Sequence, residues 1–271
     1  MGEKARQYKP STVRRLDTLS RNECADPDCD RKLIARDGET IVSKICHIEA
    51  ASENGPRFNP KMDDEDRRHF DNLILLCDEC HSIIDNPENE ENYPVELLKS
   101  WKKTHETKSQ QSILVNKPRL LNQAINGIAE LDIEEASENL NNLTPFNITD
   151  KISYNHIKRN KSLIEEYGKY YTKVNTLYSE LEKQGSFKKE KLLRNINLLY
   201  VRAKGKYVLD GYDKLKNIQD NADNIIEDIE NSILENVDGN SSEKDNIAFA
   251  IPIIMVDAFM RCKILEKPDT Q

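Results

Sequence analysis

The sequence predicts an α+β protein in two parts, a small metal-stapled module followed by an all-α domain of long antiparallel helices. Three observations support this prediction. Two close cysteine pairs lie within the first 106 residues, and two short β-prone runs lie between those pairs. Beyond residue 119, apolar residues recur in steps of three and four, which is the spacing of an amphipathic helix.

The length of 271 residues suits one large domain or two ordinary ones. We place the first module over residues 1–106, a linker over 107–118 and the helical domain over 119–271. The linker is placed there because Lys108-Ser109-Gln110-Gln111-Ser112 and Pro118 interrupt any regular pattern. The net charge of -8 argues against a broadly basic surface for nucleic acid. An acidic nuclease remains compatible with this charge, because a divalent cation and a few placed basic residues can contact phosphate.

No secretory signal is visible, since the first ten residues, MGEKARQYKP, contain no apolar stretch. The longest apolar run, 247–260, contains Pro252 and Asp257 and is shorter than the roughly 20 residues needed to cross a bilayer. We therefore expect a soluble cytoplasmic protein with no membrane partner.

In the first module we expect strands over 40–45 and 71–76, because both runs are apolar and the first is rich in β-branched residues. A helix is expected to start near Cys80 or His81. A further helix is expected from Pro94 to about Lys108, with Trp101 packing back on the module.

The cysteine pairs predict a structural metal site. Cys24 and Cys29 form a C-x4-C pair, and Cys77 and Cys80 form a C-x2-C pair. Without a secretory signal, two such pairs indicate metal binding rather than disulfides. Zn²⁺ prefers four soft ligands in a tetrahedron, and four thiolates leave no open position for water. We therefore predict a structural zinc ion that holds together a module with a thin apolar core.

Three polar residues stand out beside these pairs: His47, Asn72 and His81. They lie in Cys46-His47-Ile48-Glu49-Ala50-Ala51-Ser52, Asn54-Gly55-Pro56-Arg57 and the run from Asp71-Asn72 to Cys80-His81. Over residues 20–106 the order and spacing of these segments resemble the HNH, or ββα-metal, endonuclease family. The resemblance implies a β-hairpin and a helix that hold one divalent cation, Mg²⁺ or Mn²⁺, against the scissile phosphate.

The resemblance also implies a role for each residue. His47 is the general base, Asn72 orients its ring through an amide hydrogen bond, and His81 binds the catalytic cation. Asp85 lies one helical turn beyond His81 and is assigned as a second ligand. The alternatives are a structural role for His47, a turn-capping role for Asn72, and zinc binding by His81.

Cys46 departs from the family pattern, since many members have Asp or His immediately before the general base. A thiolate is a poor ligand for Mg²⁺. Three interpretations stand: Asp85 takes over the role, the ion is a softer one such as Mn²⁺ or Ni²⁺, or Cys46 only packs. Arg57, Arg67 and Arg68 either contact phosphate or lie on a solvated loop face.

The helical domain contains two apolar stripes, which predict two long antiparallel helices with a shorter one around 119–143. Gly185-Ser186 separates the two long helices. The stripes are Ile164, Tyr167, Tyr171, Val174, Tyr178 and Leu181, then Leu215, Ile218, Ala222, Ile225 and Ile229. From residue 107 onward, basic and acidic residues nearly balance. This balance favours contact with protein over contact with phosphate.

The segment 251–265 resembles the partner-docking domain of ABC-three-component antiphage systems, including the Lamassu-like systems. The resemblance implies an SMC-like ABC ATPase as partner, with self-association as the other assembly. Its apolar residues Ile253, Ile254, Val256, Phe259 and Met260 suggest a docking surface. The alternative is a buried helix that closes the bundle.

The leading hypothesis is therefore a DNA endonuclease that acts as the effector of an antiphage complex. One alternative keeps the fold without the chemistry, as a zinc-stapled nucleic-acid-binding or scaffold protein. The other is a stand-alone restriction-type nuclease, which the near-neutral charge of the helical domain disfavours.

Overall fold

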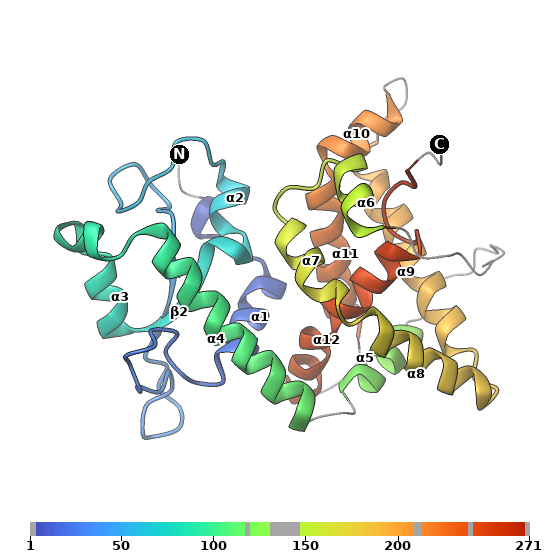
Figure 1. Cartoon of the computed structure of the whole chain (residues 1–271), viewed down its shortest axis with the longest axis horizontal. Coiled ribbons are helices and arrows are strands. Elements are labelled where there is room, and N and C mark those ends of the chain that lie inside the picture. The colour runs from blue at the N-terminus through green and yellow to red at the C-terminus, as the bar shows by residue number, and fades with distance from the viewer. Residues whose placement is uncertain (1–3, 117–119, 131–146, 209–212, 238–240, 269–271) are drawn as a thin grey trace. The chain divides into compact units, whose positions relative to one another are not determined.

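A computed structural model describes residues 4–116, 120–130, 147–208, 213–237 and 241–268 of the chain. The chain divides into two compact units, Met1–Pro118 and Arg119–Gln271. We call them the cysteine unit and the helical unit, and each is described by itself (Figure 1).

The cysteine unit combines several short helices and one long helix with a two-stranded antiparallel sheet. Its elements are η1 (Lys4–Arg6), α1 (Pro10–Ser20), β1 (Ser43–His47), α2 (Asp64–Arg68), η2 (Phe70–Asn72), β2 (Leu73–Cys77), α3 (Asp78–Ile84), η3 (Pro87–Asn92) and α4 (Val95–Asn116). Both predicted strands are present but begin later than expected, at Ser43 and Leu73 rather than at residues 40 and 71, and α3 follows β2 directly. The predicted order of two strands and a helix is therefore found.

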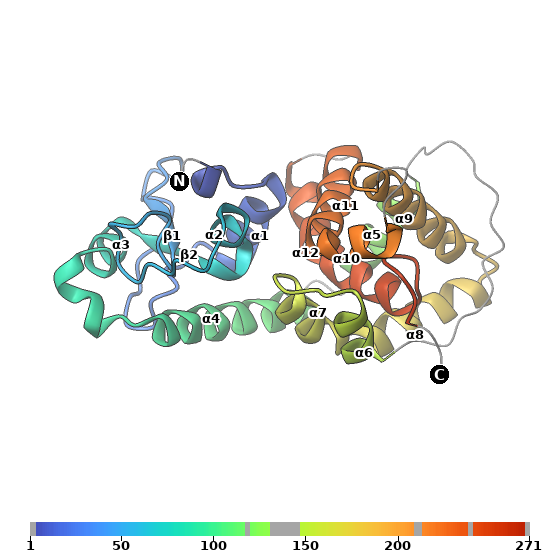
Figure 2. The same ribbon diagram turned by 90° about the horizontal axis from the view of Figure 1, so that it is seen from above.

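Strands β1 and β2 form a two-stranded antiparallel sheet, seen side by side in Figure 2. Cys46 pairs with Ile74, and His47 pairs with Leu73. Every residue of β2 is buried, because α1 and α3 both pack against this strand. The hairpin thereby places His47 at the end of β1, while β2 leads straight into the helix that carries His81.

Side-chain hydrogen bonds cap the N-termini of α2 and α3. Asp63 and Asp66 form a reciprocal capping box at the start of α2. The Cys77 side chain caps α3 by accepting a hydrogen bond from the Cys80 amide. A residue of the cysteine cluster therefore also starts the helix that follows it.

Helix α4 is longer than the sequence predicts. It runs to Asn116, so residues 107–116 are helical rather than part of a linker. The polar Lys-Ser-Gln-Gln-Ser run contains neither Pro nor Gly, and such residues lower helix propensity without ending a helix. Trp101 packs against the core of the unit, and its ring meets Tyr93 edge to face at 5.8 Å.

The helical unit is all α in the part of it that the structure describes. Its elements are α5 (Leu120–Ala129), α6 (Ile148–Tyr154), α7 (Lys161–Gly168), α8 (Tyr171–Lys183), α9 (Lys188–Gly205), α10 (Lys214–Asp220), α11 (Ala222–Asn236) and α12 (Ser241–Met260). The short helix predicted around 119–143 corresponds to α5, and residues 131–146 lie outside the described residues.

The first predicted long helix is divided into α7 and α8. The division follows Gly168, where an added Cβ would come within 2.3 Å of the Ile148 side chain on α6. The stripe nonetheless stays on the inner side, with Ile164, Tyr167, Val174 and Tyr178 buried. The predicted break at Gly185 is present, and this glycine has a positive φ of 73°.

The second predicted long helix is also divided, into α10 and α11. Its stripe is buried from Ile218 to Ile229, whereas Leu215, in the first turn of α10, is exposed. The expectation of two long helices was therefore too simple, since α9 and α12 are principal helices of the unit as well. Both belong to the same packed core, because α11 contacts α9 and α12.

Helix α12 lies at the centre of the helical unit. It contacts α5, α7, α8, α9 and α11, and every residue from Ile247 to Phe259 is buried. A helix that is apolar on all sides is expected to be surrounded by other helices. The residues predicted to form an apolar docking surface are thus largely covered by the unit's own helices, which corrects that expectation.

The end of α12 is held by buried polar groups. The fully buried Lys151 ammonium group donates hydrogen bonds to the carbonyl oxygens of Phe259 and Ile264. The buried Asp257 accepts two hydrogen bonds from Arg261, at 3.1 and 3.0 Å. These bonds satisfy polar groups whose burial alone would be costly.

Burial lowers the pKa of Lys151 to about 8, and we expect this to appear in the pH dependence of stability. Between pH 8 and 10 the unfolded chain keeps this proton while the native chain loses it, so the stability rises with pH. Between pH 8 and 10, the free energy of unfolding of the wild type should rise by up to about 3 kcal/mol more than that of Lys151→Met.

The measurement is urea unfolding of both full-length chains, followed by circular dichroism at several pH values. Equal pH dependence of the two chains between pH 8 and 10 would contradict the lowered pKa.

Candidate functional site

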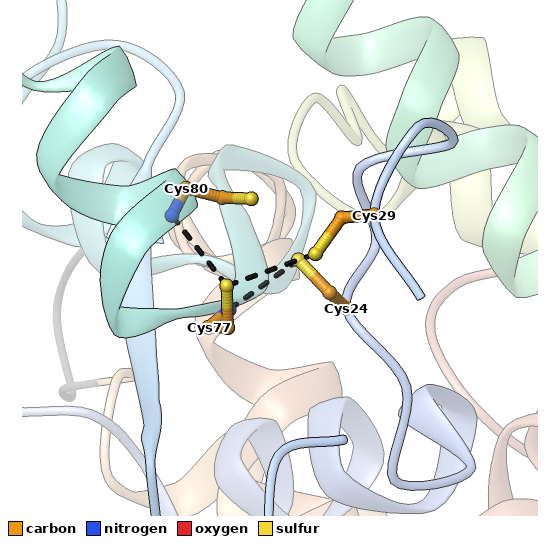
Figure 3. A group of neighbouring side chains, drawn as sticks. All are labelled: Cys24, Cys29, Cys77 and Cys80. Atoms are coloured by element: carbon orange, nitrogen blue, oxygen red, sulfur yellow. Dashed lines mark hydrogen bonds between the residues drawn. The ribbon is translucent and has the colours of Figure 1, made fainter. Parts of the chain in front are cut away.

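The four paired cysteines come together in the cysteine unit. Cys24 and Cys29 lie in the loop after α1, Cys77 ends β2, and Cys80 lies in the first turns of α3. Their sulfur atoms all lie within 4.8 Å of one another, and Figure 3 shows the side chains pointing toward a common centre. All four are free cysteines.

The distances fit a tetrahedral metal site and do not fit a disulfide. The Sγ atoms of Cys29 and Cys77 are 3.9 Å apart. Zinc–sulfur bonds of about 2.3 Å place neighbouring sulfurs about 3.8 Å apart in a tetrahedron. A disulfide would need about 2 Å between its sulfurs. The donor set is thus compatible with a structural metal ion such as zinc.

Backbone amides donate to these sulfur atoms. The Cys77 amide donates to Cys24 Sγ at 3.3 Å, and the Cys80 amide donates to Cys77 Sγ at 3.5 Å. Burial raises the pKa of Cys24 to about 12. Burial also acts on Cys77, but hydrogen bonds from Cys80 and its neighbours outweigh it and lower the pKa of this thiol. A bound dication would supply the charge that three buried thiolates and the half-buried Cys29 thiolate require.

A second group of possible metal ligands comprises Cys46, His81 and Asp85. Their ligand atoms also lie within 4.8 Å of one another. His81 Nε2 is 3.4 Å from an Asp85 oxygen, one helical turn away, as the sequence predicts for two residues that face the same ion. His81 and Asp85 are partly exposed, so this group is open to solvent, whereas three of the four clustered cysteines are buried.

Cys46 is buried within this second group. Its thiol donates to Asp85 at 3.4 Å, and its side chain is 1% exposed. Burial and the nearby Asp85 carboxylate raise the pKa of this thiol well above its ordinary value. A neutral thiol that donates to Asp85 matches the interpretation in which Cys46 packs and Asp85 is the ligand.

His47 is contacted by two residues of the N-terminal segment, Ala5 and Tyr8. Its Nε2 atom lies 3.0 Å from the carbonyl oxygen of Ala5, and its ring centre lies 5.7 Å from that of Tyr8. Burial is the largest effect on its pKa, which is lowered. The neutral imidazole is therefore favoured, and this is the form that can accept a proton.

Asn72 does not use its amide group as the resemblance implies. Its Nδ2 donates to the carbonyl oxygens of Glu49 and Arg67, and its Oδ1 accepts from the Glu49 amide. Both amide protons are therefore committed to backbone groups, and the structure corrects the expected amide bond to the His47 ring. Asn72 instead holds the turn after β1, which was the alternative interpretation.

Two buried arginines were missed by the sequence analysis, which expected either phosphate contacts or a solvated face. Arg57 donates to the carbonyl oxygens of Ile48 and Ile84, both at 2.8 Å, and its Nη2 lies 3.4 Å from Asp85. Arg67 donates to the carbonyl oxygens of Ala50 and Asn59. Each arginine links backbone groups from different segments of the unit, and no local sequence pattern predicts such a role.

The helical unit matches a known family. Residues 119–266, more than half of the chain, match the model of C-terminal domain 10 (CTD10) of the ABC-three component systems. The chain belongs to this family. A search of curated proteins found no match.

The CTD10 match links the chain to ABC-three-component antiphage systems and to the protein partners within such a system. It coincides with the helical unit, and α12, whose end resembled such a domain, is its central helix. None of the described helices is both long enough and apolar enough to span a membrane.

The cysteine cluster predicts that the purified protein holds about one zinc ion per chain through dialysis. Cys77→Ser should abolish zinc retention and unfold the cysteine unit, because binding energy at such a site is folding energy. The measurements are elemental analysis and circular dichroism. Cys46→Ser is the matched control, since this cysteine is equally buried but lies outside the cluster. A folded Cys77→Ser protein without zinc would contradict a structural role for the metal.

Proposed function

We propose that this chain is a metal-dependent DNA endonuclease and the effector of an antiphage complex. The observation that carries the proposal is the arrangement of three side chains on one hairpin and one helix. A histidine whose neutral form is favoured ends β1, His81 lies in α3, and Asp85 lies one turn further on, at the C-cap of that helix. The HNH resemblance assigns the base to His47 and a cation ligand to His81, and the helical spacing adds Asp85 as a second ligand.

His81 and Asp85 fit a divalent cation of the Mg²⁺ or Mn²⁺ class. They offer one nitrogen and two carboxylate oxygens, and the thiol of Cys46 and the guanidinium of Arg57 hold the carboxylate in place. A cation bound there would stabilise negative charge on the phosphate and on the leaving oxygen.

The chain itself would contribute to hydrolysis a general base, His47, in its neutral form. Because burial lowers the pKa of His47, the neutral ring is available near neutral pH to take a proton from water. The buried arginines and Asn72 support the surrounding backbone and leave this chemistry to the two histidines and Asp85.

Cys46 supports a second candidate, a zinc-stapled nucleic-acid-binding or scaffold module without activity. This residue occupies a position where many HNH members have a cation ligand, and here its thiol is buried and protonated. The cleavage assay below decides between the two functions.

The helical unit supports a protein-binding role. Its family belongs to multi-component systems, and its nearly balanced charge suits contact with protein. We infer that it binds a partner such as an SMC-like ABC ATPase and thereby controls where the nuclease acts.

We expect the wild type to nick or linearise plasmid DNA when Mg²⁺ or Mn²⁺ is supplied. His47→Ala should lower the rate by about 10²- to 10⁴-fold, because it removes the general base. His81→Ala should also inactivate, and the loss should be partly recovered at high cation concentration. Gel assays of cleavage, with zinc content as the measure of folding, check both outcomes.

The matched control is His156→Asn. His156 is exposed, lies in the helical unit and has a positive φ of 54° that asparagine tolerates. It should cleave like the wild type. Cleavage by His47→Ala at the wild-type rate would remove the general-base assignment, and no cleavage by the wild type with either cation would favour the scaffold function.

A further inference from the structure

The N-terminal turn lies against His47, although it falls outside residues 20–106, where the HNH resemblance is found. Ala5, the middle residue of η1, is fully buried, and its carbonyl oxygen is 3.0 Å from His47 Nε2. Tyr8 follows, with its ring tilted 39° to that of His47. The turn therefore contacts the proposed base through a directional polar bond and an aromatic neighbour.

This segment is fixed to the rest of the unit. Arg68, at the end of α2, donates to the carbonyl oxygen of Gln7 at 2.9 Å. Lys9 forms an ion pair with Glu65 of the same helix at 3.6 Å, and η1 itself contacts α2. These contacts, at Gln7 before Tyr8 and at Lys9 after it, fix the segment that carries the Ala5 carbonyl.

The bond to Ala5 determines which ring nitrogen carries the proton. A carbonyl oxygen only accepts hydrogen bonds, so His47 Nε2 must be the donor. In the neutral ring the other nitrogen, Nδ1, then has a free lone pair. No hydrogen bond of Nδ1 is found among the described residues, so this lone pair is available to a water molecule.

Asn72 does not compete for this role. Both of its amide protons are donated to backbone carbonyl oxygens of Glu49 and Arg67. The orientation of the ring, which the resemblance assigned to Asn72, falls to the N-terminal turn.

We propose that Ala5 is a positioning residue of the cleavage site, whose carbonyl oxygen holds His47 as the Nε2–H tautomer and makes Nδ1 the basic atom. This inference rests on the proposed endonuclease function. His47 Nδ1 takes one proton from water while the water oxygen bonds to phosphorus and the bond from phosphorus to the leaving oxygen breaks. The leaving oxygen takes a proton from solvent. The Ala5 carbonyl also stabilises the imidazolium ion that forms, because its negative end faces Nε2–H.

The tautomer can be read without any cleavage assay. We would label histidine with ¹⁵N in the full-length chain and record long-range proton–nitrogen spectra, with the His47→Gln variant identifying the signals. The expected result is a protonated Nε2 and an unprotonated Nδ1 in His47. A protonated Nδ1 in the neutral ring would overturn the proposal.

The effect on catalysis can be tested without changing a side chain. Replacing Arg6 by its α-hydroxy analogue turns the Ala5 carbonyl into that of an ester, a weaker hydrogen-bond acceptor. Since a hydrogen bond contributes about 0.5–1.5 kcal/mol, kcat should fall by roughly 2- to 12-fold while KM stays unchanged. The same ester at the exposed Arg36–Asp37 junction is the matched control and should leave kcat unchanged.

Deletion of residues 2–9 provides a second variant. It should retain zinc, because the cysteine cluster remains, yet lose both the Nε2–H signal and most of the cleavage rate. Unchanged kcat in the Ala5–Arg6 ester would overturn the positioning role. Failure of the proposed function itself has a different signature, namely a wild type that shows the expected tautomer but cleaves no DNA with Mg²⁺ or Mn²⁺.

Discussion

The cysteine cluster ties together the parts of the cysteine unit that the candidate site requires. It joins the loop after α1 to the junction of β2 and α3, segments separated by about fifty residues of chain. Closing so long a loop costs conformational entropy, which a strongly bound ion offsets. The buried hydrophobic cluster around it is small and includes Cys24, Cys77 and Cys80 themselves, so the cluster is part of the core rather than an addition to it.

The same cluster explains why the candidate catalytic residues stand where they do. Cys77 is at once a member of the cluster, the last residue of β2 and the cap of α3. Cys77 therefore joins the strand to the helix that carries His81 and is followed by Asp85. Arg57 completes the arrangement by joining the loop after His47 to the end of α3. Its burial is tolerated because its guanidinium finds carbonyl and carboxylate acceptors.

The helical unit depends on a different constraint. From Ile247 to Phe259, helix α12 is almost entirely apolar, so other helices surround this segment, and the few polar groups near its end must find partners inside the unit. Lys151 and the Asp257–Arg261 pair do so. A protein-binding role for this CTD10 unit therefore does not rest on an uncovered apolar surface between Ile247 and Phe259 of α12.

The sequence by itself determined the two-part architecture, the cysteine cluster, the two strands and the helix after them. These depend on spacing and periodicity, which are local properties. It also brought His81 and Asp85 together, because residues four apart share a helix face. It misjudged the end of α4, the division of α7 from α8, and the exposure of Leu215. The polar run in α4 lacks the Pro or Gly that would end a helix, and Gly168, where α7 ends, lies close to the Ile148 side chain, a contact that periodicity cannot reveal.

Only the tertiary structure decided how the site is held. The Asn72 amide donates to backbone carbonyl oxygens rather than to the His47 ring, and Arg57 and Arg67 are buried. The carbonyl oxygen that contacts His47 belongs to Ala5. These hydrogen bonds join side chains to backbone groups of other segments, up to 42 residues away in the case of His47 and Ala5, and they leave no periodic trace in a sequence. They arise once the cysteine cluster and the hairpin have brought those segments within reach, and for that reason the polar frame of the site was visible only in three dimensions.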